Sequence, residues 1–307
     1  MAGITDSAMR QMCRLYGADV VYSEMASATA LFHKPEKTLK LLKFDKAERP
    51  YVVQLFGNDP EHFAKATEII TKTVKPDGID INFGCPAKKV FGHGSGCALM
   101  PQKELARKII LAVCENTTFP VSLKIRAGLK NLTALEFIEN IKDLPFTAIM
   151  VHGRTYEGSF SGEVDFKVAE EIKKIIPKKI VLANGGITTP VQAAKIMEDY
   201  PLLDGLGIAR GVLGKPYLFA QIKELLQNPS LLDKERCPKG TERYDFNKIK
   251  KISIRHAEII YKEKGVLGML EIRKHLVWYF KGFPGAAELR KKLVQVKSVK
   301  EIKNILK

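Results

Sequence analysis

The sequence predicts an α/β protein, a (β/α)8 TIM barrel whose first strand is truncated or missing, followed by a small all-α helical domain. Three observations lead to this prediction. Seven short apolar runs recur between longer amphipathic runs over about 220 residues, the pattern of repeated βα units around a parallel sheet. The glycine fingerprint GxGxxG is absent after the first predicted strand, which disfavours a doubly wound sheet. A basic segment with helical periodicity ends the chain.

The expected strands are short runs rich in β-branched and apolar residues, as in sheets that are buried on both faces. They lie at residues 18–22, 51–57, 78–83, 121–125, 148–153, 179–185 and 204–210. The opening residues, 1–10, have the pattern of a turn and helix that would follow a strand. We therefore expect Met1 to stand where a first strand ends.

Amphipathic segments separate these strands, and we expect helices at 60–74, 101–115, 133–144, 165–176, 189–200 and 216–227. Two of them open on a capping residue followed by proline, at Asp59 and Thr189.

Further helices are expected near the end of the chain, at 247–264, 266–281, 286–294 and 299–307. A polar stretch rich in Pro, Asp and Lys precedes them. The predicted domains are a barrel at 1–230, a linker at 231–243 and a basic helical domain at 244–307.

The charge of the chain is strongly positive and unevenly distributed. The net charge is +16, and residues 241–307 hold 17 Lys and Arg against 7 Asp and Glu, so 17 − 7 = +10 lies in this last part. Such a surface suits a polyanion, either a nucleic acid or an anionic membrane. The alternative is a lysine-rich surface that only maintains solubility.

Composition excludes several other classes of protein. No apolar run is long enough to cross a membrane and no signal peptide opens the chain, so we expect a cytoplasmic protein. The five cysteines lack CxxC spacing, which argues against a disulfide framework and against a zinc site. We expect reduced thiols and no bound metal.

Polar side chains end the predicted strands, where barrels of this kind build their active sites. They are Gln54, Asp80, Asn82, Lys124, Arg126, His152, Arg154, Asn184 and Arg210. Two glycine-rich segments, 183–188 and 207–216, follow the last strands, where backbone amides of this fold bind phosphate. A phosphate beside Gln54, Lys124 and His152 suits flavin mononucleotide (FMN), with Lys124 stabilising the reduced ring. The alternative for Lys124 is a structural ion pair.

Seven segments of the chain resemble the tRNA-dihydrouridine synthase family in their order and spacing. They are MAGITDSAMR, VQLFGND, DINFGCPAKKV with GSGCALM, LKIRAG, VHGRTYEGSFSG, NGGI and GIARGVLGKP. The resemblance implies an FMN barrel that uses NADH or NADPH to reduce the C5=C6 bond of specific uridines in tRNA. It puts Cys85 at the position of the general acid, which would protonate C5 while hydride passes from N5 of FMN to C6. It also implies tRNA as partner, and we expect a monomer.

The resemblance further implies which residues contact the two ligands. Cofactor contacts fall on Met1, Ala2, Gln54, Lys124, His152, Asn184, Gly185, Gly186, Ala209 and Arg210. Substrate contacts fall on Asn82, Arg126, Arg154, Lys88 and Lys89. The sequence departs from the family at Gly186, where Asp is commoner, and at Ala209, where Gly is usual. Both replacements are small, so we expect the phosphate site to be kept.

Two cysteines flank the same predicted loop, and their surroundings differ. Cys85 follows a strand end in a polar stretch with lysines, so we expect an accessible thiol that keeps its proton. Cys97 lies in the apolar run CALM and is expected to be packed. In the helical tail, Trp278 could stack on RNA or belong to the core.

Two other functions fit parts of the sequence. An enzyme similar to dihydroorotate dehydrogenase would act on a free pyrimidine, with its loop cysteine as a base. The HGRT segment and the basic tail argue against it. A non-catalytic RNA-binding barrel is the second alternative, and it would hold no flavin.

Overall fold

The computed structural model describes residues 1–159, 161–228 and 245–307. The predicted linker, 231–243, and Cys237 within it therefore lie outside the described residues. Within the described parts, none of the helices combines the length and the apolar character needed to cross a membrane.

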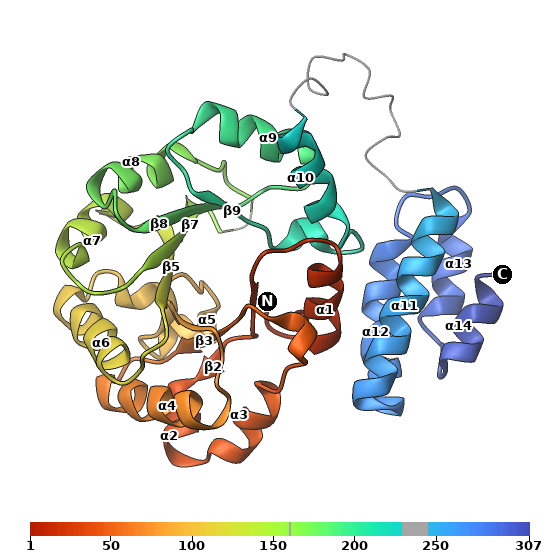
Figure 1. The fold of residues 1–307 in the computed structure, drawn as a ribbon, viewed down its shortest axis with the longest axis horizontal. Helices are drawn as coiled ribbons and strands as arrows, with labels where there is room; N and C mark the ends of the chain where they lie inside the picture. Colours follow the sequence, from red (N-terminus) through yellow and green to blue (C-terminus); the bar gives the residue numbers. More distant parts are fainter. Residues whose placement is uncertain (160, 229–244) are drawn as a thin grey trace. The chain divides into compact units, whose positions relative to one another are not determined.

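A curled parallel sheet forms the centre of the fold, with helices α4, α6, α7 and α8 outside it (Figure 1). The hydrogen-bonded order follows the sequence: β1 (Val21–Tyr22), β3 (Tyr51–Phe56), β4 (Gly78–Asn82), β5 (Val121–Leu129), β7 (Ala148–Thr155), β8 (Ile180–Asn184) and β9 (Gly205–Gly207). All seven predicted strands are present in the predicted order. This confirms the barrel-type α/β fold.

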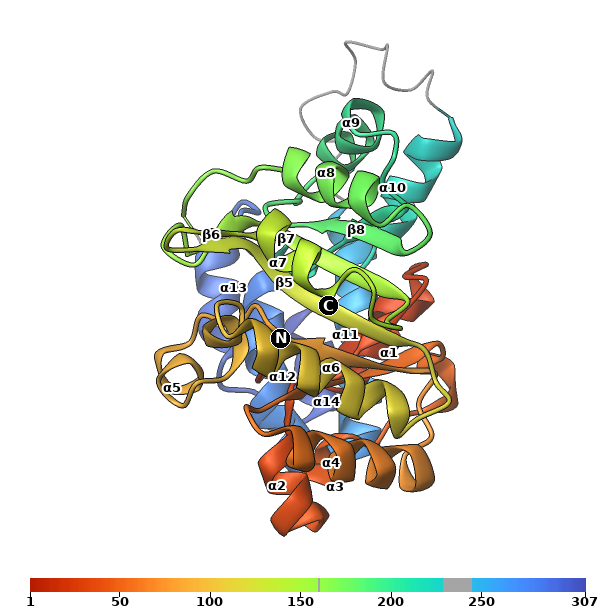
Figure 2. The same ribbon diagram turned by 90° about the vertical axis from the view of Figure 1, so that its left-hand side faces the viewer.

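Two short strands extend this sheet beyond the prediction. β2 (Ala26–Ser27) pairs in parallel with the end of β3, and β6 (Leu132–Thr133) pairs antiparallel with β5. β5 runs to Leu129, past the predicted end at residue 125, because a tight turn at Lys130, with φ of 52°, folds the chain back into this hairpin. The hairpin and helix α5 (Lys88–Gly92) lie at the same end of the sheet (Figure 2).

The expected barrel helices are all present. They are α4 (Pro60–Thr73), α6 (Lys103–Glu115), α7 (Ala134–Ile141), α8 (Lys167–Ile175), α9 (Pro190–Asp199) and α10 (Leu218–Gln227). Asp59 caps α4 as predicted, because its Oδ1 accepts the backbone N–H of Glu61 at 2.8 Å. Two more helices, α2 (Ala28–His33) and α3 (Pro35–Leu41), were not predicted. Each spans at most seven residues, too short to show helical periodicity.

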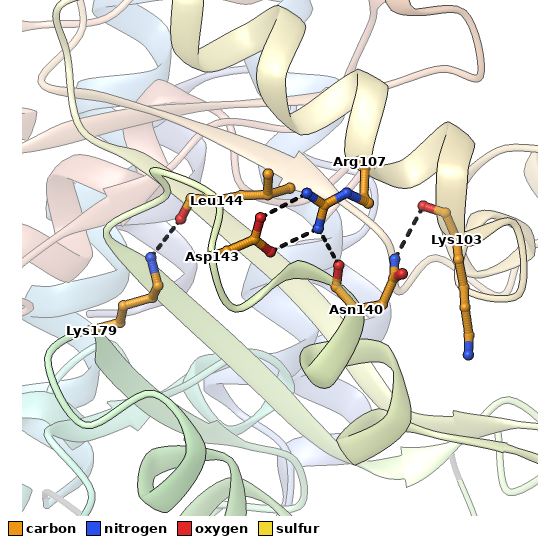
Figure 3. Close-up of polar contacts among 6 residues, drawn as sticks. All are labelled: Lys103, Arg107, Asn140, Asp143, Leu144 and Lys179. Atoms are coloured by element: carbon orange, nitrogen blue, oxygen red, sulfur yellow. Dashed lines mark hydrogen bonds and ion pairs between the residues drawn. The ribbon is translucent and has the colours of Figure 1, made fainter.

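A polar network ties α6 to the end of α7 (Figure 3). The guanidinium of Arg107 donates to both carboxylate oxygens of Asp143 at 2.7 Å and also to the carbonyl of Asn140. Nearby, Nζ of Lys179 donates to the carbonyl of Leu144 at 2.7 Å. Leu144 and Lys179 lie shortly before β7 and β8, so this part of the network is at the amino ends of those two strands.

The C-terminal helices are α11 (Phe246–Lys264), α12 (Val266–Tyr279), α13 (Ala286–Leu293) and α14 (Val299–Ile305), as predicted. Their buried apolar side chains form a common core with Met12 and Tyr217. The chain accordingly divides into two compact units, and the second comprises residues 7–18, 188–194 and 210–307. It contains α1 (Ser7–Leu15) and α10, which the predicted boundaries assign to the barrel. Since residues 229–244 are not described, the boundaries at 230 and 244 stay a prediction.

Two side chains of the helical tail, Trp278 and Arg273, have structural contacts. Trp278 is half-buried with its ring edge-on to His275, at 5.2 Å between centroids, which favours packing over stacking on RNA. Arg273 donates from Nε to the carbonyl of Val296 at 3.0 Å, so it connects α12 to the segment before α14.

Candidate active site

The first part of the site is a buried carboxylate between two neighbouring strands. Gln54 on β3 and Asp80 on β4 are in register, and Nε2 of Gln54 donates to Oδ2 of Asp80 at 2.7 Å. From β5, Oγ of Ser122 donates to Oδ1 of Asp80 at 2.6 Å. The Asp80 side chain is 1% exposed. Its burial raises the pKa of Asp80 to about 6, although both hydrogen bonds and the charge of Lys124 oppose the rise.

The loop that carries Cys85 begins at the end of β4, where Asn82 holds it. Oδ1 of Asn82 accepts the backbone N–H of Gly84 at 3.0 Å and that of Cys85 at 2.8 Å. Nδ2 of the same amide donates to Oε1 of Gln54 at 2.8 Å. Asn82 is therefore bonded on both sides, and it connects Cys85 to the polar cluster on β3 and β4.

The two cysteines of this loop differ as predicted. Cys85 is half-buried, whereas Cys97, in the short 3₁₀ turn η2 (Gly96–Leu99), is fully buried. Burial raises the pKa of Cys97 to about 12, so its thiol is packing material. The two residues meet through the backbone, because the N–H of Cys97 donates to the carbonyl of Cys85 at 3.2 Å. This hydrogen bond therefore connects the turn η2 to the backbone of the Cys85 loop.

A second polar pair lies on β5 and β8. Nζ of Lys124 donates to Oδ1 of Asn184 at 3.0 Å, and Nδ2 of Asn184 donates to the carbonyl of Gly207 at 2.6 Å. Burial lowers the pKa of Lys124 to about 8, against the favourable charge of Asp80. Lys124 is thus still largely protonated at neutral pH. Both readings of this residue, flavin contact and partner of a buried acid, are compatible with its position.

His152 on β7 lies beside the glycines that follow β8. A Cβ built on Gly185 would be 2.7 Å from Cδ2 of His152, so only glycine fits there, and its φ of 121° also favours glycine. NH1 of Arg154 lies 3.4 Å from Nε2 of His152. The next residue, Gly186, has φ of 65° and is exposed. Backbone groups at this turn can therefore approach a ligand closely.

Arg126 occupies a different environment from the one predicted. It is 1% exposed, and its guanidinium donates to the carbonyls of Gly84 and Thr155 at 2.9 Å and of Ser159 at 3.0 Å. These bonds join the Cys85 loop to the segment after β7. The arrangement therefore favours a role for Arg126 in positioning the Cys85 loop, rather than the predicted contact with substrate.

The remaining predicted residues lie at the edge of this region or outside it. Lys88 and Lys89 are exposed on α5. Ala2 is exposed, and the carbonyl of Met1 accepts the N–H of Thr5 at 3.0 Å. Ala209 is half-buried, and Arg210 belongs to the second compact unit. Their contacts with ligands stay predictions.

The side chains at the strand ends suit a flavin. They combine carboxamides at Gln54 and Asn184, an ammonium at Lys124 and an imidazole at His152, a donor set for a planar ring with carbonyls. Gly186, the second glycine after β8, is exposed and has φ of 65°, so its backbone can approach a phosphate closely. No group of three metal-ligating side chains occurs in the part of the chain that the structure describes.

One member of the site was not predicted from sequence. Oγ of Ser122 donates to Asp80, whereas the sequence predicts for Ser122 only a place in the strand at 121–125. It lies two residues before Lys124 on β5, and because alternate strand residues share a face, this spacing was the available signal.

Comparison with known proteins shows the family to which this chain belongs. Over residues 1–307, the chain matches the family model described as "Dihydrouridine synthase (Dus)". The tRNA-dihydrouridine synthase B of Pasteurella multocida is 34% identical over 285 residues, covering 92% of this chain and 82% of that protein. The tRNA-dihydrouridine synthase B of Pseudomonas aeruginosa is 33% identical over 295 residues, covering 94% and 85%.

Among solved structures, the crystal structure of TcOYE with pHBA is similar with a TM-score of 0.51 at 8% identity, covering 72% of this chain and 83% of that one. This likeness concerns the fold alone. The match to the family model runs over the full sequence and agrees with the segments that carry the resemblance, from the Cys85 loop to the glycines after β8. The chain therefore belongs to the dihydrouridine synthase family.

Proposed function

We propose that this enzyme forms 5,6-dihydrouridine in tRNA by reducing the C5=C6 bond of specific uridines, with FMN as cofactor and NADH or NADPH as reductant. The single observation that carries the proposal is the Cys85 loop. Asn82, at the end of β4, accepts the backbone N–H of the half-buried Cys85 next to the polar strand ends that suit a flavin. Membership of the family supports the flavin and the substrate.

In this proposal the cofactor is held by the predicted set of contacts: Met1, Ala2, Gln54, Lys124, His152, Asn184, Gly185, Gly186, Ala209 and Arg210. When bound, the flavin supplies the hydride that C6 of uracil receives. Lys124 carries a positive charge at neutral pH, since its pKa is about 8. That charge would stabilise negative charge on a ligand at the mouth of the barrel.

The chain's own thiol supplies the proton. Cys85 would donate from Sγ to C5 of uracil as a general acid, while Arg154 orients the base. Asn82, predicted as a second substrate contact, instead holds the Cys85 loop, because its amide is already bonded to Gln54 and to the loop backbone. Lys88 and Lys89, exposed on α5, would contact phosphates of the RNA. A base within folded RNA must first leave its stack to reach such a site. We assign the grip on the RNA during this step to the basic helices α11–α14.

Membership of the dihydrouridine synthase family argues against the two alternative functions, a dihydroorotate-dehydrogenase-like enzyme and a non-catalytic RNA-binding barrel. Relatives that cover most of this chain carry the name of the tRNA enzyme. A dihydroorotate-dehydrogenase-like activity on a free pyrimidine would not need the +10 charge of residues 241–307. We further propose that the enzyme works in the cytoplasm as a monomer.

The test is the formation of dihydrouridine in unmodified tRNA, measured by mass spectrometry of nucleosides with NADH or NADPH present. We expect Cys85→Ala to keep the flavin absorbance and to lower the rate by about 10²–10⁴-fold, the usual contribution of a general acid. The matched control is Cys114→Ala, which removes a thiol on α6. Full activity of Cys85→Ala would remove the general-acid role. A colourless protein, or one that acts only on free pyrimidines, would refute the function itself.

A further inference from the structure

We infer that Asp80 is a positioning residue for Cys85: its buried carboxylate fixes, through the amides of Gln54 and Asn82, the hydrogen bond that holds the backbone of the cysteine. We call this set the Asp80 relay: Asp80, Gln54, Asn82 and the backbone N–H of Cys85. The importance of Cys85 rests on the proposed function, but the relay itself does not depend on it.

Three consecutive hydrogen bonds form the relay. The N–H of Cys85 donates to Oδ1 of Asn82 at 2.8 Å, and Nδ2 of Asn82 donates to Oε1 of Gln54 at 2.8 Å. Nε2 of Gln54 then donates to Oδ2 of Asp80 at 2.7 Å. Every donor points toward the carboxylate. Hydrogen bonds aligned in one direction polarise and strengthen one another.

The two ends of the relay require the same orientation of both amides. An ionised carboxylate can only accept, so the nitrogen of the Gln54 amide must face Asp80. A backbone N–H can only donate, so the oxygen of the Asn82 amide must face Cys85. Turning either amide over would bring two donors or two acceptors together. The carboxylate therefore sets the state of a loop three bonds away.

The acceptor end is fixed in turn by its neighbours. Oγ of Ser122 donates to the second oxygen of Asp80 at 2.6 Å. The backbone N–H of Gln54 donates to Oγ of Ser23 at 2.9 Å, and Gln54 and Asp80 are paired across β3 and β4. Asn82 is 6% exposed, so water has little access to its amide. The rigid sheet thus transmits its geometry to the loop.

A different role for Asp80 would predict different effects of its substitutions. As the counter-charge of Lys124, Asp80 would matter for its charge alone. In the relay it matters as an acceptor for Gln54. Asp80→Asn separates the two, because it removes the charge but keeps an oxygen that can face Gln54. The Ser122 hydroxyl can then accept from the new amide nitrogen, since a hydroxyl both donates and accepts.

The experiment is hydrogen exchange by mass spectrometry on the full-length flavin-loaded enzyme, read on a peptide containing Gly84 and Cys85 and normalised to a peptide of β8. We expect Asp80→Asn to exchange within about twofold of wild type, and Asp80→Ala to exchange at least about tenfold faster, the effect of losing one buried hydrogen bond. Gln54→Leu cuts the relay without touching the buried charge and should match Asp80→Ala. The rate of Cys85 alkylation by iodoacetamide should follow the same order.

The control is Glu48→Ala, which removes another fully buried carboxylate, one that accepts the N–H of Asp45 at 2.8 Å. It should lower the thermal midpoint without changing the normalised exchange at Cys85. The double variant Asp80→Ala with Gln54→Leu should equal Gln54→Leu alone, because the relay is already cut. Additive effects, or equal rates for Asp80→Asn and Asp80→Ala, would overturn the inference.

If Asp80→Ala does not fold, Gln54→Leu and Asp80→Asn still test the relay through the rate of hydrogen exchange at Gly84 and Cys85 and the rate of Cys85 alkylation. Wild-type exchange in Gln54→Leu would refute the relay. The exchange readout needs no turnover, so an active Cys85→Ala enzyme would remove the general-acid role and leave the relay standing. Loss of the relay would likewise leave the proposed function untouched.

Discussion

The backbone of Gly185, directly after β8, lies against the ring of His152 on the neighbouring strand β7. A Cβ at position 185 would be 2.7 Å from Cδ2 and 3.0 Å from Nε2 of the imidazole. The φ of Gly185 is 121°, a conformation that side chains rarely adopt. The glycine and the histidine are therefore one structural unit at the proposed flavin site.

We expect Gly185→Ala to displace His152 and to weaken flavin binding at least about tenfold, because both the contact and the backbone conformation oppose a Cβ, each at about 1–3 kcal/mol. The measurement is a fluorescence titration with FMN. The control is Gly92→Ala, since a Cβ at that position meets no atom within 4 Å. Equal affinities for the two variants would contradict the prediction.

The lowered pKa of Lys124 leads us to expect that cofactor binding depends on pH. Its pKa is lowered by burial from 10.5 to about 8, so the ammonium loses its proton as pH rises through 8. We expect the affinity for flavin to fall between pH 7 and pH 9, and Lys124→Met to remove this dependence. Stability should move the other way, because burial of the charge opposes folding, and this opposition fades as pH rises from 8 toward 10.5. A wild-type affinity that is flat over this range would exclude a charged contact.

Arg126→Lys should destabilise the protein by about 2–4 kcal/mol, because a buried fork that bonds three carbonyls is replaced by a group that cannot reach all of them. Urea unfolding measures this change, and alkylation of Cys85 should become faster. The control is Arg107→Lys, at an ion pair with Asp143 that solvent screens. It should have a much smaller effect. If the two variants are equally stable, Arg126 does not anchor the loop.

The basic helices should give tRNA binding a strong dependence on salt. Arg255→Ala and Lys292→Ala change exposed cations on α11 and α13, and each should weaken binding and lower the slope of log K against log salt by about one. The control is Lys142→Ala, at the end of α7 and hence at the amino ends of the strands. Filter binding at several salt concentrations gives the slopes. Unchanged slopes for both tail variants would place the RNA elsewhere.

Much of this protein could be predicted from local sequence. The apolar runs that became β3, β4, β5 and β8 are short and bounded by polar residues, and burial on both faces leaves little choice of structure for them. The separation of Cys85 from Cys97 also followed from their immediate neighbours. The helices α2 and α3 could not be predicted, because each is too short to show a helical repeat of apolar residues.

The sequence by itself determined the order of strands and helices and the polar strand ends, and it singled out the loop that we propose carries the acid, because each depends on residues close together in the chain. Only the tertiary structure decided what those polar groups do. It turned Arg126 toward three backbone carbonyls and joined Asp80, Gln54 and Asn82 into one relay. These contacts depend on the register between parallel strands, which brings residues together that are 26 to 42 positions apart. Local patterns carry no record of that register, since it is set by how the whole sheet curls and packs.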